Sequence, residues 1–427
     1  MLDRYSNIVR YEAHLTALSP IRSGSSEGDT DAILRSAEGR AFIQGPSLTG
    51  ALRDWIKNSD YRDLNTVLFG PDRDTPLSDS REGDGALVVS DLVFKAGAEE
   101  QSRPRLCIEG ATGSAGDKFS VTGLAAGTQG RFTLLWFGSG QDSRQQQAVE
   151  AALAAMNAGD IRLGAQKSNG FGRVGLAVTV RHFDMTDSAD RKAWIADSPE
   201  GEPLPLPRRA ESRFVRFTVK GLLPNVLIKA GASVSGGGTT FVNMRENGKP
   251  LIPGSSVKGA VHARAALIER QLCGSLAVTE RLFGRDARDG DNGGAGTLRF
   301  SDADLSRGRE TKISRIRINK FTGGVMRGAL FSEQPLSAPV SISIAAPDDP
   351  AGCALLLFAL RDLGLGLYNL GSGGSIGRGQ LTGAEIRAVT PDGKTLTLSF
   401  DSERRSSLSD PDGLWPVWAE ALKGGNA

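Results

Sequence analysis

The chain has 427 residues, 39% of them hydrophobic and 23% charged, so it is long enough for two or three globular domains and unlike a disordered chain. Its 51 basic and 49 acidic residues leave a net charge of +2, which by itself does not indicate a nucleic-acid partner. Three scattered cysteines exclude a disulfide framework and a cysteine-rich zinc site, and they favour a cytoplasmic location. No signal-peptide pattern or membrane-spanning apolar run is present.

In chain order, the first half alternates strand and helix patterns. A strand is predicted over 9–18, followed by a helix over 47–57, where Leu48, Leu52 and Ile56 share one helical face. The remaining predicted elements are strands over 86–94 and 131–137, a helix over 145–157, and a strand over 161–180 that a glycine-rich loop interrupts. This βαββαβ order is the ferredoxin-like arrangement that RNA-recognition modules also use.

The second half repeats the first. IPGSSVKGAVH at 252–262 matches IQGPSLTGALR at 43–53, and the glycine loop at 370–381 matches the loop at 163–174. The predicted elements recur in the same order, over 213–219, 255–271, 296–302, 340–345, 351–363 and 379–389. We therefore predict an α+β fold with two tandem ferredoxin-like (RRM-like) domains, 1–184 and 213–390, a linker over 185–212 and a tail over 391–427.

The turn before each first helix is a candidate anion site, because a helix N-terminus carries free N–H groups and a positive dipole end. In the second half Ser255 is the predicted N-cap, and Ser256 and Lys258 stand beside it. The first half offers Ser47, Thr49 and Arg53. The spacing differs from that of nucleotide-binding loops, so no nucleotide cofactor is expected. An ordinary capped helix remains the alternative.

Glycine loops and a basic stretch are two further candidates for binding a phosphate backbone. The loops contain Gly170 and Gly172 in the first half and Gly377 and Gly379 in the second, where main-chain amides could approach phosphate closely. Between 307 and 327 basic residues dominate, and the alternation around 315–319 predicts a strand with one basic and one apolar face. The basic candidates are Arg315, Arg317 and Lys320, with Lys118 in the first half. The alternative is a solvated charged surface.

An acidic loop before the first turn contains Asp29 and Asp31. Carboxylates there could hold a divalent metal, or orient the 2′-hydroxyl of an RNA for attack on its own phosphate. The matching segment of the second half, 235–243, has no carboxylate. A solvated acidic loop is the alternative. The three histidines show no catalytic spacing, so a histidine-based nuclease is poorly supported.

These motifs resemble those of the RAMP superfamily of CRISPR-associated proteins, and more narrowly the backbone subunit of type III effector complexes. The pieces that match best are GKPLIPGSSVKG (248–259), INKFTGGVMRGALF (318–331) and GSGGSIGRG (371–379). Weaker matches cover 39–53 and 108–119. Two backbone units fused in one chain are similar to what type III-D systems carry.

The resemblance implies ferredoxin-like palms that hold a guide RNA (crRNA) and β-hairpin thumbs, here over 115–127 and 324–338, that separate guide from target. It also implies an aspartate before the IPGSS turn that cleaves target RNA with a divalent metal, expected to be Mg²⁺. That position falls on Asp31, with Asp29 in reserve, and near Thr240 in the second half, which is expected to be inactive. Thr49 replaces the family's lysine, and Gln44 its proline.

We therefore expect a double backbone subunit whose partners are guide RNA, complementary target RNA and other type III effector subunits, with no membrane and no zinc. Its first unit is expected to be a metal-dependent endoribonuclease. One alternative is a non-catalytic scaffold of the same complex. Another is a RAMP-type ribonuclease that processes precursor guide RNA, although the duplication and the IPGSS turns argue against it.

Overall fold

The computed structural model describes residues 6–24, 33–71, 85–108, 115–138, 143–198, 200–207, 212–235, 238–285, 293–326 and 329–424. The chain divides into two compact units. The first unit comprises Met1–Ser102, Ser120–Lys167 and Phe171–Arg213. The second comprises Phe214–Ala427 together with two short segments of the first repeat, Arg103–Phe119 and Ser168–Gly170.

The first unit is built on an antiparallel sheet with β1 (Asn7–Ala17) at its centre. β7 (Gln129–Gly138) and β8 (Val174–Asp184) flank β1, so that Tyr11 lies between Leu134 and Val180. The sheet order is β2-β4-β7-β1-β8-β9, with β3 also paired to β7. The outer strands are β2 (Phe42–Ile43), β3 (Leu87–Val89), β4 (Leu92–Phe94) and β9 (Glu202–Leu204).

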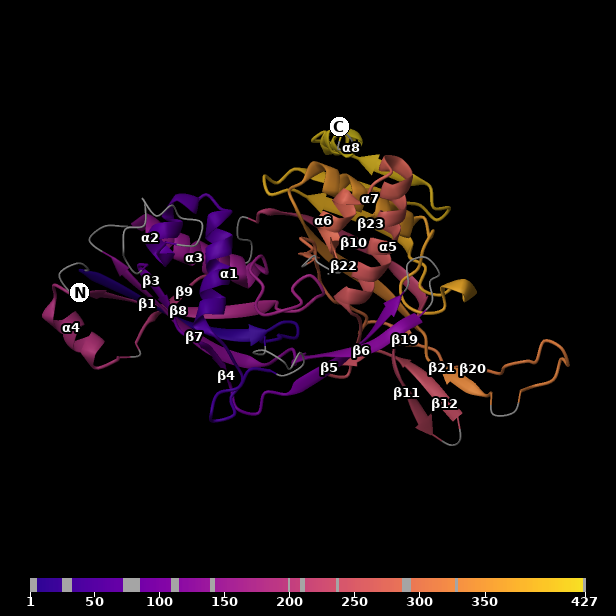
Figure 1. Cartoon of the computed structure of the whole chain (residues 1–427), viewed down its shortest axis with the longest axis horizontal. Coiled ribbons are helices and arrows are strands. Elements are labelled where there is room, and N and C mark those ends of the chain that lie inside the picture. The colour runs from indigo at the N-terminus through magenta and orange to yellow at the C-terminus, as the bar shows by residue number, and fades with distance from the viewer. Residues whose placement is uncertain are drawn as a thin grey trace. The chain divides into compact units, whose positions relative to one another are not determined.

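Two helices, α1 (Gly45–Lys57) and α3 (Ser143–Ala158), cover one face of this sheet (Figure 1). Alternate residues of β1, among them Tyr11 and Leu15, are buried in one cluster with Leu48 and Leu52 of α1 and Leu153 of α3. The periods of two along the strand and of three to four along the helix therefore meet in a single core. This confirms the predicted ferredoxin-like βαββαβ arrangement.

The second unit repeats this design on β10 (Phe214–Val226), which β22 (Leu336–Pro347) and β23 (Thr382–Val389) flank. β17 (Arg299–Phe300) forms one edge, and β24 (Thr395–Phe400) and β25 (Ser406–Ser409) extend the other. The core lies between this sheet and α5 (Gly254–Cys273) and α7 (Pro350–Gly364). Side chains of β22 alternate between buried and exposed over most of its length, as expected for a sheet with one covered face.

Shorter elements complete the two units. They are α2 (Asn65–Phe69), α6 (Ala277–Phe283), β13 (Arg245–Glu246), β14 (Lys249–Ile252), β15 (Gly284–Arg285), β16 (Gly294–Ala295), β18 (Ala303–Asp304), β19 (Arg309–Glu310), and the 3₁₀ turns Arg62–Leu64 and Gly374–Ile376. In the part of the chain that the structure describes, no helix is both long and apolar enough to cross a bilayer.

Segments outside the two predicted domains also carry structure. Residues 185–212, expected to be a linker, include α4 (Ser188–Ile195) and β9, which extends the first sheet by pairing with β8. Residues 391–427, expected to be a tail, supply β24, β25 and α8 (Leu414–Gly424). The ring of Trp418 on α8 lies 6.0 Å from that of Phe217, so α8 closes the second core.

Each repeat also has a hairpin outside its main sheet. In the first repeat β5 (Glu100–Ile108) pairs with β6 (Ala115–Leu124). In the second, β20 (Ile313–Arg315) pairs with β21 (Phe331–Glu333), which continues into a sheet with β12 (Gly238–Asn243) and β11 (Lys229–Ser235). The second thumb therefore begins before the predicted residue 324, and from Leu336 onward the chain is already in the core strand β22.

Candidate functional site

The acidic loop falls largely outside the described residues, and Asp29 and Asp31 lie there. Its two ends are described and are joined, because the Leu34 N–H donates to Ser23 Oγ at 3.1 Å. Ser23 and Ile33 are both buried, so the loop leaves from and returns to fixed positions. Among the described residues, no group of three histidine, cysteine or acidic side chains could hold a metal. A metal site at Asp31 therefore stays a prediction.

The matching segment of the second half is a regular hairpin. Thr240 lies in β12, opposite Ser233 of β11 on one side and Ser332 of β21 on the other. Thr239 and Thr240 contribute hydroxyl groups, which carry no charge with which to hold a divalent ion. This is consistent with the expectation that the second repeat does not cut, which stays a prediction.

The predicted N-cap at Ser255 is wrong, since α5 begins one residue earlier and its N-cap is Pro253. The first helical N–H, that of Gly254, donates to Asp302 Oδ1 at 2.7 Å. α1 has the same design, because its N-cap is Gln44 and the Gly45 N–H donates to Asp91 Oδ1 at 2.7 Å. The first N–H of each helix therefore already binds a carboxylate of the protein itself.

The other residues of the two turns have different surroundings. Ser47 is exposed, whereas Thr49 donates its hydroxyl proton to the Gly45 carbonyl within α1. Arg53 donates to Asn65 and to the Gly70 carbonyl, and its guanidinium lies over the Phe69 ring. It thus fixes α2 to α1. In the second unit Ser255 and Ser256 are half-buried, and Lys258 Nζ lies 3.3 Å from Ser168 Oγ.

The glycine loops owe their glycines to backbone conformation. Gly170, Gly172, Gly377 and Gly379 all have positive φ, between 70° and 97°. The Gly172 N–H donates to the Pro20 carbonyl at 2.8 Å, and the Gly379 N–H to the Asn225 carbonyl at 2.7 Å. These two amides therefore tie each loop to the end of the first strand of its repeat.

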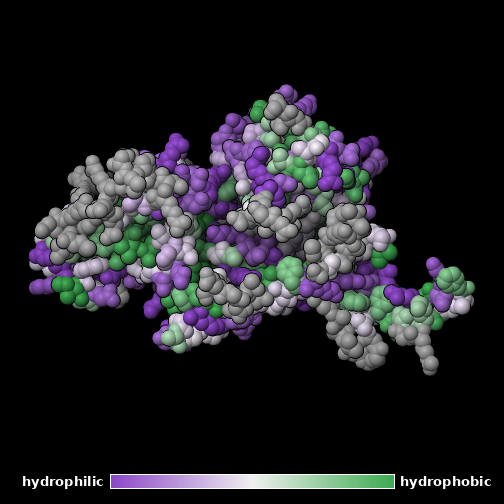
Figure 2. Space-filling model, viewed as in Figure 1, coloured by the Kyte–Doolittle hydropathy of each residue, from purple (hydrophilic) through white to green (hydrophobic). Residues whose placement is uncertain are grey.

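The basic stretch is not the strand predicted over 315–319. Ile313–Arg315 pairs with β21, whereas Ile318 forms only an isolated bridge to Val325, and the side chains of Ile316 and Ile318 are 50% and 58% exposed. Arg317 is exposed, and Lys320 lies over the ring of Phe321, which is 86% exposed. Figure 2 shows hydrophobic and hydrophilic residues side by side on the segment that projects beyond β20 and β21. In the first repeat Lys118 is exposed on β6.

A family model, that of the RAMP superfamily, matches residues 14–175 and 228–382 of the chain. The chain belongs to the RAMP superfamily. Each match covers most of one ferredoxin-like repeat. The first begins within β1 and the second just after β10, and each continues through the glycine loop of its repeat. The duplication read from the sequence is therefore a duplication of the RAMP module itself.

Among solved structures, the chain is similar to one described as "Cryo-EM structure of the Type III-B Cmr-beta bound to cognate target RNA". The identity is 13% and the TM-score 0.33, over 42% of this chain. The chain covers 62% of the length of that structure's chain. No curated protein matches it.

The second RAMP repeat contains a buried ion cluster that the sequence did not reveal. Glu333 of β21, almost fully buried, lies 3.3 Å from Lys229, 3.0 Å from Arg315 and 2.7 Å from Arg378. Burial alone would raise the pKa of Glu333, but Arg378 and Lys229 outweigh it and hold this pKa below its ordinary value. This Glu333 cluster joins the thumb, β11 and the glycine loop, from which Arg378 comes.

The first RAMP repeat replaces this ion pair with an apolar contact. At the place of Arg378 it has Phe171, which is fully buried. A Cβ added to Gly123 of β6 would lie 3.0 Å from the Ile21 carbonyl oxygen and 3.1 Å from the Phe171 ring, so glycine at this position lets the ring pack closely against the strand. The two repeats thus connect thumb and glycine loop by different chemistry at the same place.

Arg103, one of the basic residues of the first half, has carboxylate partners that the sequence did not indicate. Its side chain is 3% exposed within the second unit and donates to both carboxylate oxygens of Asp302, at 3.2 and 2.7 Å, and to Glu246. Burial would lower the pKa of Arg103, but the two carboxylates raise it above its ordinary value. The sequence around Arg103 gives no signal of such partners, because they lie 143 and 199 residues away.

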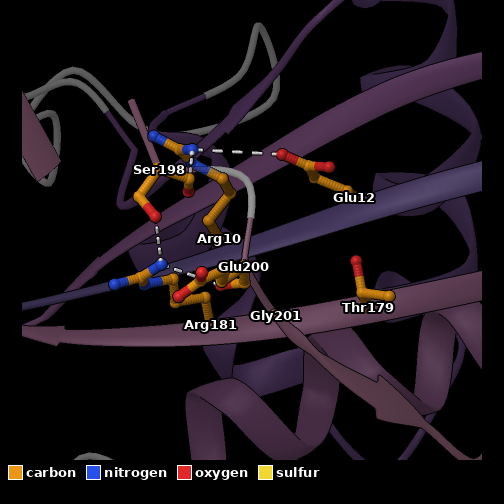
Figure 3. Close-up of a pocket in the computed structure, with 7 residues that line it drawn as sticks. All are labelled: Arg10, Glu12, Thr179, Arg181, Ser198, Glu200 and Gly201. Atoms are coloured by element: carbon orange, nitrogen blue, oxygen red, sulfur yellow. Dashed lines mark hydrogen bonds and ion pairs between the residues drawn. The ribbon is translucent and has the colours of Figure 1, made fainter. Parts of the chain in front are cut away.

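Figure 3 shows a pocket on the first unit, between β1, β8 and the segment after α4. Arg10 and Arg181 lie opposite each other on β1 and β8. Arg10 pairs with Asp197 at 2.8 Å and stacks on Phe183 and Trp194, and Arg181 donates to Ser198 and Glu200. Because both guanidinium groups already bind this segment, their role is to hold it on the sheet.

Proposed function

We propose that the chain is a double backbone subunit of an RNA-guided effector complex of the type III class, which binds guide RNA and complementary target RNA. The observation that carries the proposal is the match of the RAMP model to both halves of the chain. The structure adds that both halves are ferredoxin-like modules with the same glycine loop, and that they stand in series in one chain.

The exposed thumb supports an RNA surface of this kind. Arg317 and Lys320 provide cations for phosphate, and Ile316, Ile318 and Phe321 provide exposed apolar surface on which bases can stack or pack. Phosphate contacts carry no base information, so binding should tolerate any guide sequence and fall steeply with salt.

Purification of the tagged full-length chain from its native host tests this function. RNA of uniform length and other effector subunits should copurify with it, and the purified chain should bind unrelated RNAs with similar affinity at low salt. A monomeric chain free of RNA, with no affinity for RNA at low salt, would contradict the proposal.

We further propose that the first repeat cleaves the target, with Asp31 as the residue that acts and Asp29 in reserve. RNA carries its own nucleophile, so the protein has to align the 2′-hydroxyl and stabilise charge on the phosphate. A divalent cation such as Mg²⁺ would supply that stabilisation, and carboxylates are its preferred ligands. The described residues at the two ends of this loop, Ser23 and Leu34, are joined by a hydrogen bond.

Labelled target RNA tests the cleavage. Asp31→Ala, or failing that the Asp29→Ala, Asp31→Ala double variant, should abolish cutting in Mg²⁺ while guide and target remain bound, and EDTA should do the same. Undiminished cutting by the double variant would make this chain a scaffold and place the nuclease on another residue or subunit.

A further inference from the structure

Asp302 forms a socket, defined here as the Asp302 carboxylate, the Gly254 N–H and the Glu246 carboxylate. Asp302 accepts from Gly254 at 2.7 Å and is also bound by both nitrogens of the Arg103 fork. Arg103 comes from hairpin β5–β6 of the preceding repeat and is part of the second unit. A hairpin arginine of one repeat is therefore buried against the carboxylate that caps the first helix of the next.

The first repeat has the same carboxylate in the same place. Ile43 pairs with Leu92 and Ile252 pairs with Ala303, and Asp91 and Asp302 each stand directly before that partner residue. Asp91 Oδ1 accepts from the first N–H of α1 at 2.7 Å, as Asp302 Oδ1 does from the first N–H of α5. The turn that carries Glu246 in the second repeat carries Glu38 in the first.

The two sockets differ in what covers them. Asp302 is bound by Arg103, and Pro253 at the start of α5 is buried. Asp91 is exposed, as are Gln44, Pro46 and Ser47 at the start of α1. Within the part of the chain that the structure describes, Asp91 has no cationic partner. The same carboxylate geometry is thus filled by an arginine in one repeat and open in the other.

We propose that Asp91 receives an arginine from a β-hairpin of a different effector subunit. This proposal rests on the proposed function, since the partner that it names is another subunit of the same effector complex. The contact between Arg103 and Asp302 is heterologous, because it joins a hairpin of one repeat to a different surface, the socket, of the next. The socket of the first repeat, at Asp91, therefore has no preceding repeat in the chain to fill it. A carboxylate that accepts the first N–H of a helix can also bind the fork of a guanidinium, as Asp302 does with Arg103.

A second copy of this chain does not fit the open socket. Arg103 stands three residues after Glu100, whose carboxylate binds Arg35, and the corresponding pair in the second repeat is Arg245 with Glu310. Three residues after Glu310 stands Ile313, which has no charge. The second hairpin therefore has the apolar side chain of Ile313 at the position where a socket needs an arginine. This mismatch prevents self-assembly into a filament and gives the chain one position in an assembly.

Photo-crosslinking and a conservative variant test the socket in the complex purified through the tagged full-length chain. A photoreactive residue in place of Gln44, which is exposed beside Asp91, should link to an arginine-containing hairpin peptide of another protein. Asp91→Asn retains the acceptor for the Gly45 N–H but loses the charge, and should lower the copurified amount of that protein by about tenfold or more.

Glu202→Gln, an exposed charge change on β9, is the matched control and should leave the copurified amount unchanged. Crosslinks to another copy of the chain, to RNA alone, or full retention of the partner by Asp91→Asn would overturn the socket. In each of those cases copurified guide RNA would still support the proposed function, whereas loss of RNA and subunits from the wild-type chain would contradict the function itself.

Discussion

At the scale of single residues, the two repeats solve one packing problem twice. In the second repeat Glu333 is surrounded by Lys229, Arg315 and Arg378, and in the first repeat Phe171 packs on Gly123. A buried ion cluster and an apolar contact of similar volume can be about equally stable, but removing one partner of the cluster leaves uncompensated charge. A single substitution at Glu333 should therefore lower the free energy of unfolding by much more than the intact cluster contributes to it.

Glu333→Gln should lower the free energy of unfolding at neutral pH by about 3 kcal/mol, because Arg378 is left buried without its counter-charge. The lowered pKa of Glu333 means that its stabilisation is present above the unfolded-state value of about 4.3 and is lost as the pH falls through the folded-state value. The difference between wild type and variant, measured by urea unfolding at pH 7 and pH 3.5, should shrink in acid. Glu202→Gln is the control and should cost little at either pH.

Gly172→Ala and Gly379→Ala should each destabilise the chain by more than about 1 kcal/mol. Their positive φ disfavours any side chain, and a Cβ would collide with the carbonyl oxygen of Leu163 or Leu370. Gly259→Ala provides the contrast. This helical glycine has open space around its Cβ position, so the alanine variant should be more stable than the wild type. Thermal unfolding compares all three. An unchanged melting temperature for Gly379→Ala would show that the loop relaxes at no cost.

At the scale of elements, the basic residues of the second thumb have two different roles: Arg317 and Lys320 are exposed for RNA, and Arg315 pairs with Glu333. Arg317→Ala and Lys320→Ala should weaken RNA binding for every sequence and should each lower the salt slope by about one, because both side chains are exposed. Arg315→Ala should mainly lower thermal stability, since Arg315 pairs with Glu333. Equal RNA affinity for the wild type and the Arg317→Ala, Lys320→Ala double variant across a salt series would show that this surface is merely solvated.

The helices and strands that could be predicted from the sequence were those whose apolar residues recur with a regular period over a short window. The 3.6-residue period located α1, and the repeat located α5 from it, while alternation located β1 and β22. The strand expected over 315–319 failed because alternation alone does not make a strand: β20 ends at Arg315, and beyond it Ile318 forms only an isolated bridge to Val325. Ser255 failed as N-cap because Asp302, 48 residues after Gly254, binds the first helical N–H, that of Gly254.

The long-range ion pairs escaped sequence reasoning for the same reason. Arg103 and Arg378 stand in a strand and in a glycine loop, where arginine normally faces solvent, and nothing nearby indicates that each is buried on carboxylates distant in the chain. A comparison of the two repeats supplies part of the missing signal. Glycine at Gly123 with phenylalanine at Phe171, against glutamate at Glu333 with arginine at Arg378, is a paired change of the kind that contacting residues show.

At the scale of the whole molecule, the duplication has produced two units that are alike in fold and unlike in chemistry. The acidic loop of the first repeat contains Asp29 and Asp31, whereas the matching segment of the second repeat, 235–243, has no carboxylate and lies mostly in β12 of the hairpin β11–β12. A target strand laid along both repeats passes two equivalent positions but meets one acidic loop. The proposed cleavage should therefore be asymmetric.

One chain should cut a bound target at one position rather than at two equivalent positions one repeat apart. Thr240 is held in a strand between β11 and β21, and its hydroxyl carries no charge to bind a metal ion. Thr240→Ala should therefore leave both the position and the rate of cutting unchanged, whereas Asp31→Ala should remove the single product. Mapping the ends of a labelled target decides this. Two cuts that both depend on this chain, or a product lost with Thr240→Ala, would show that the second repeat is active after all.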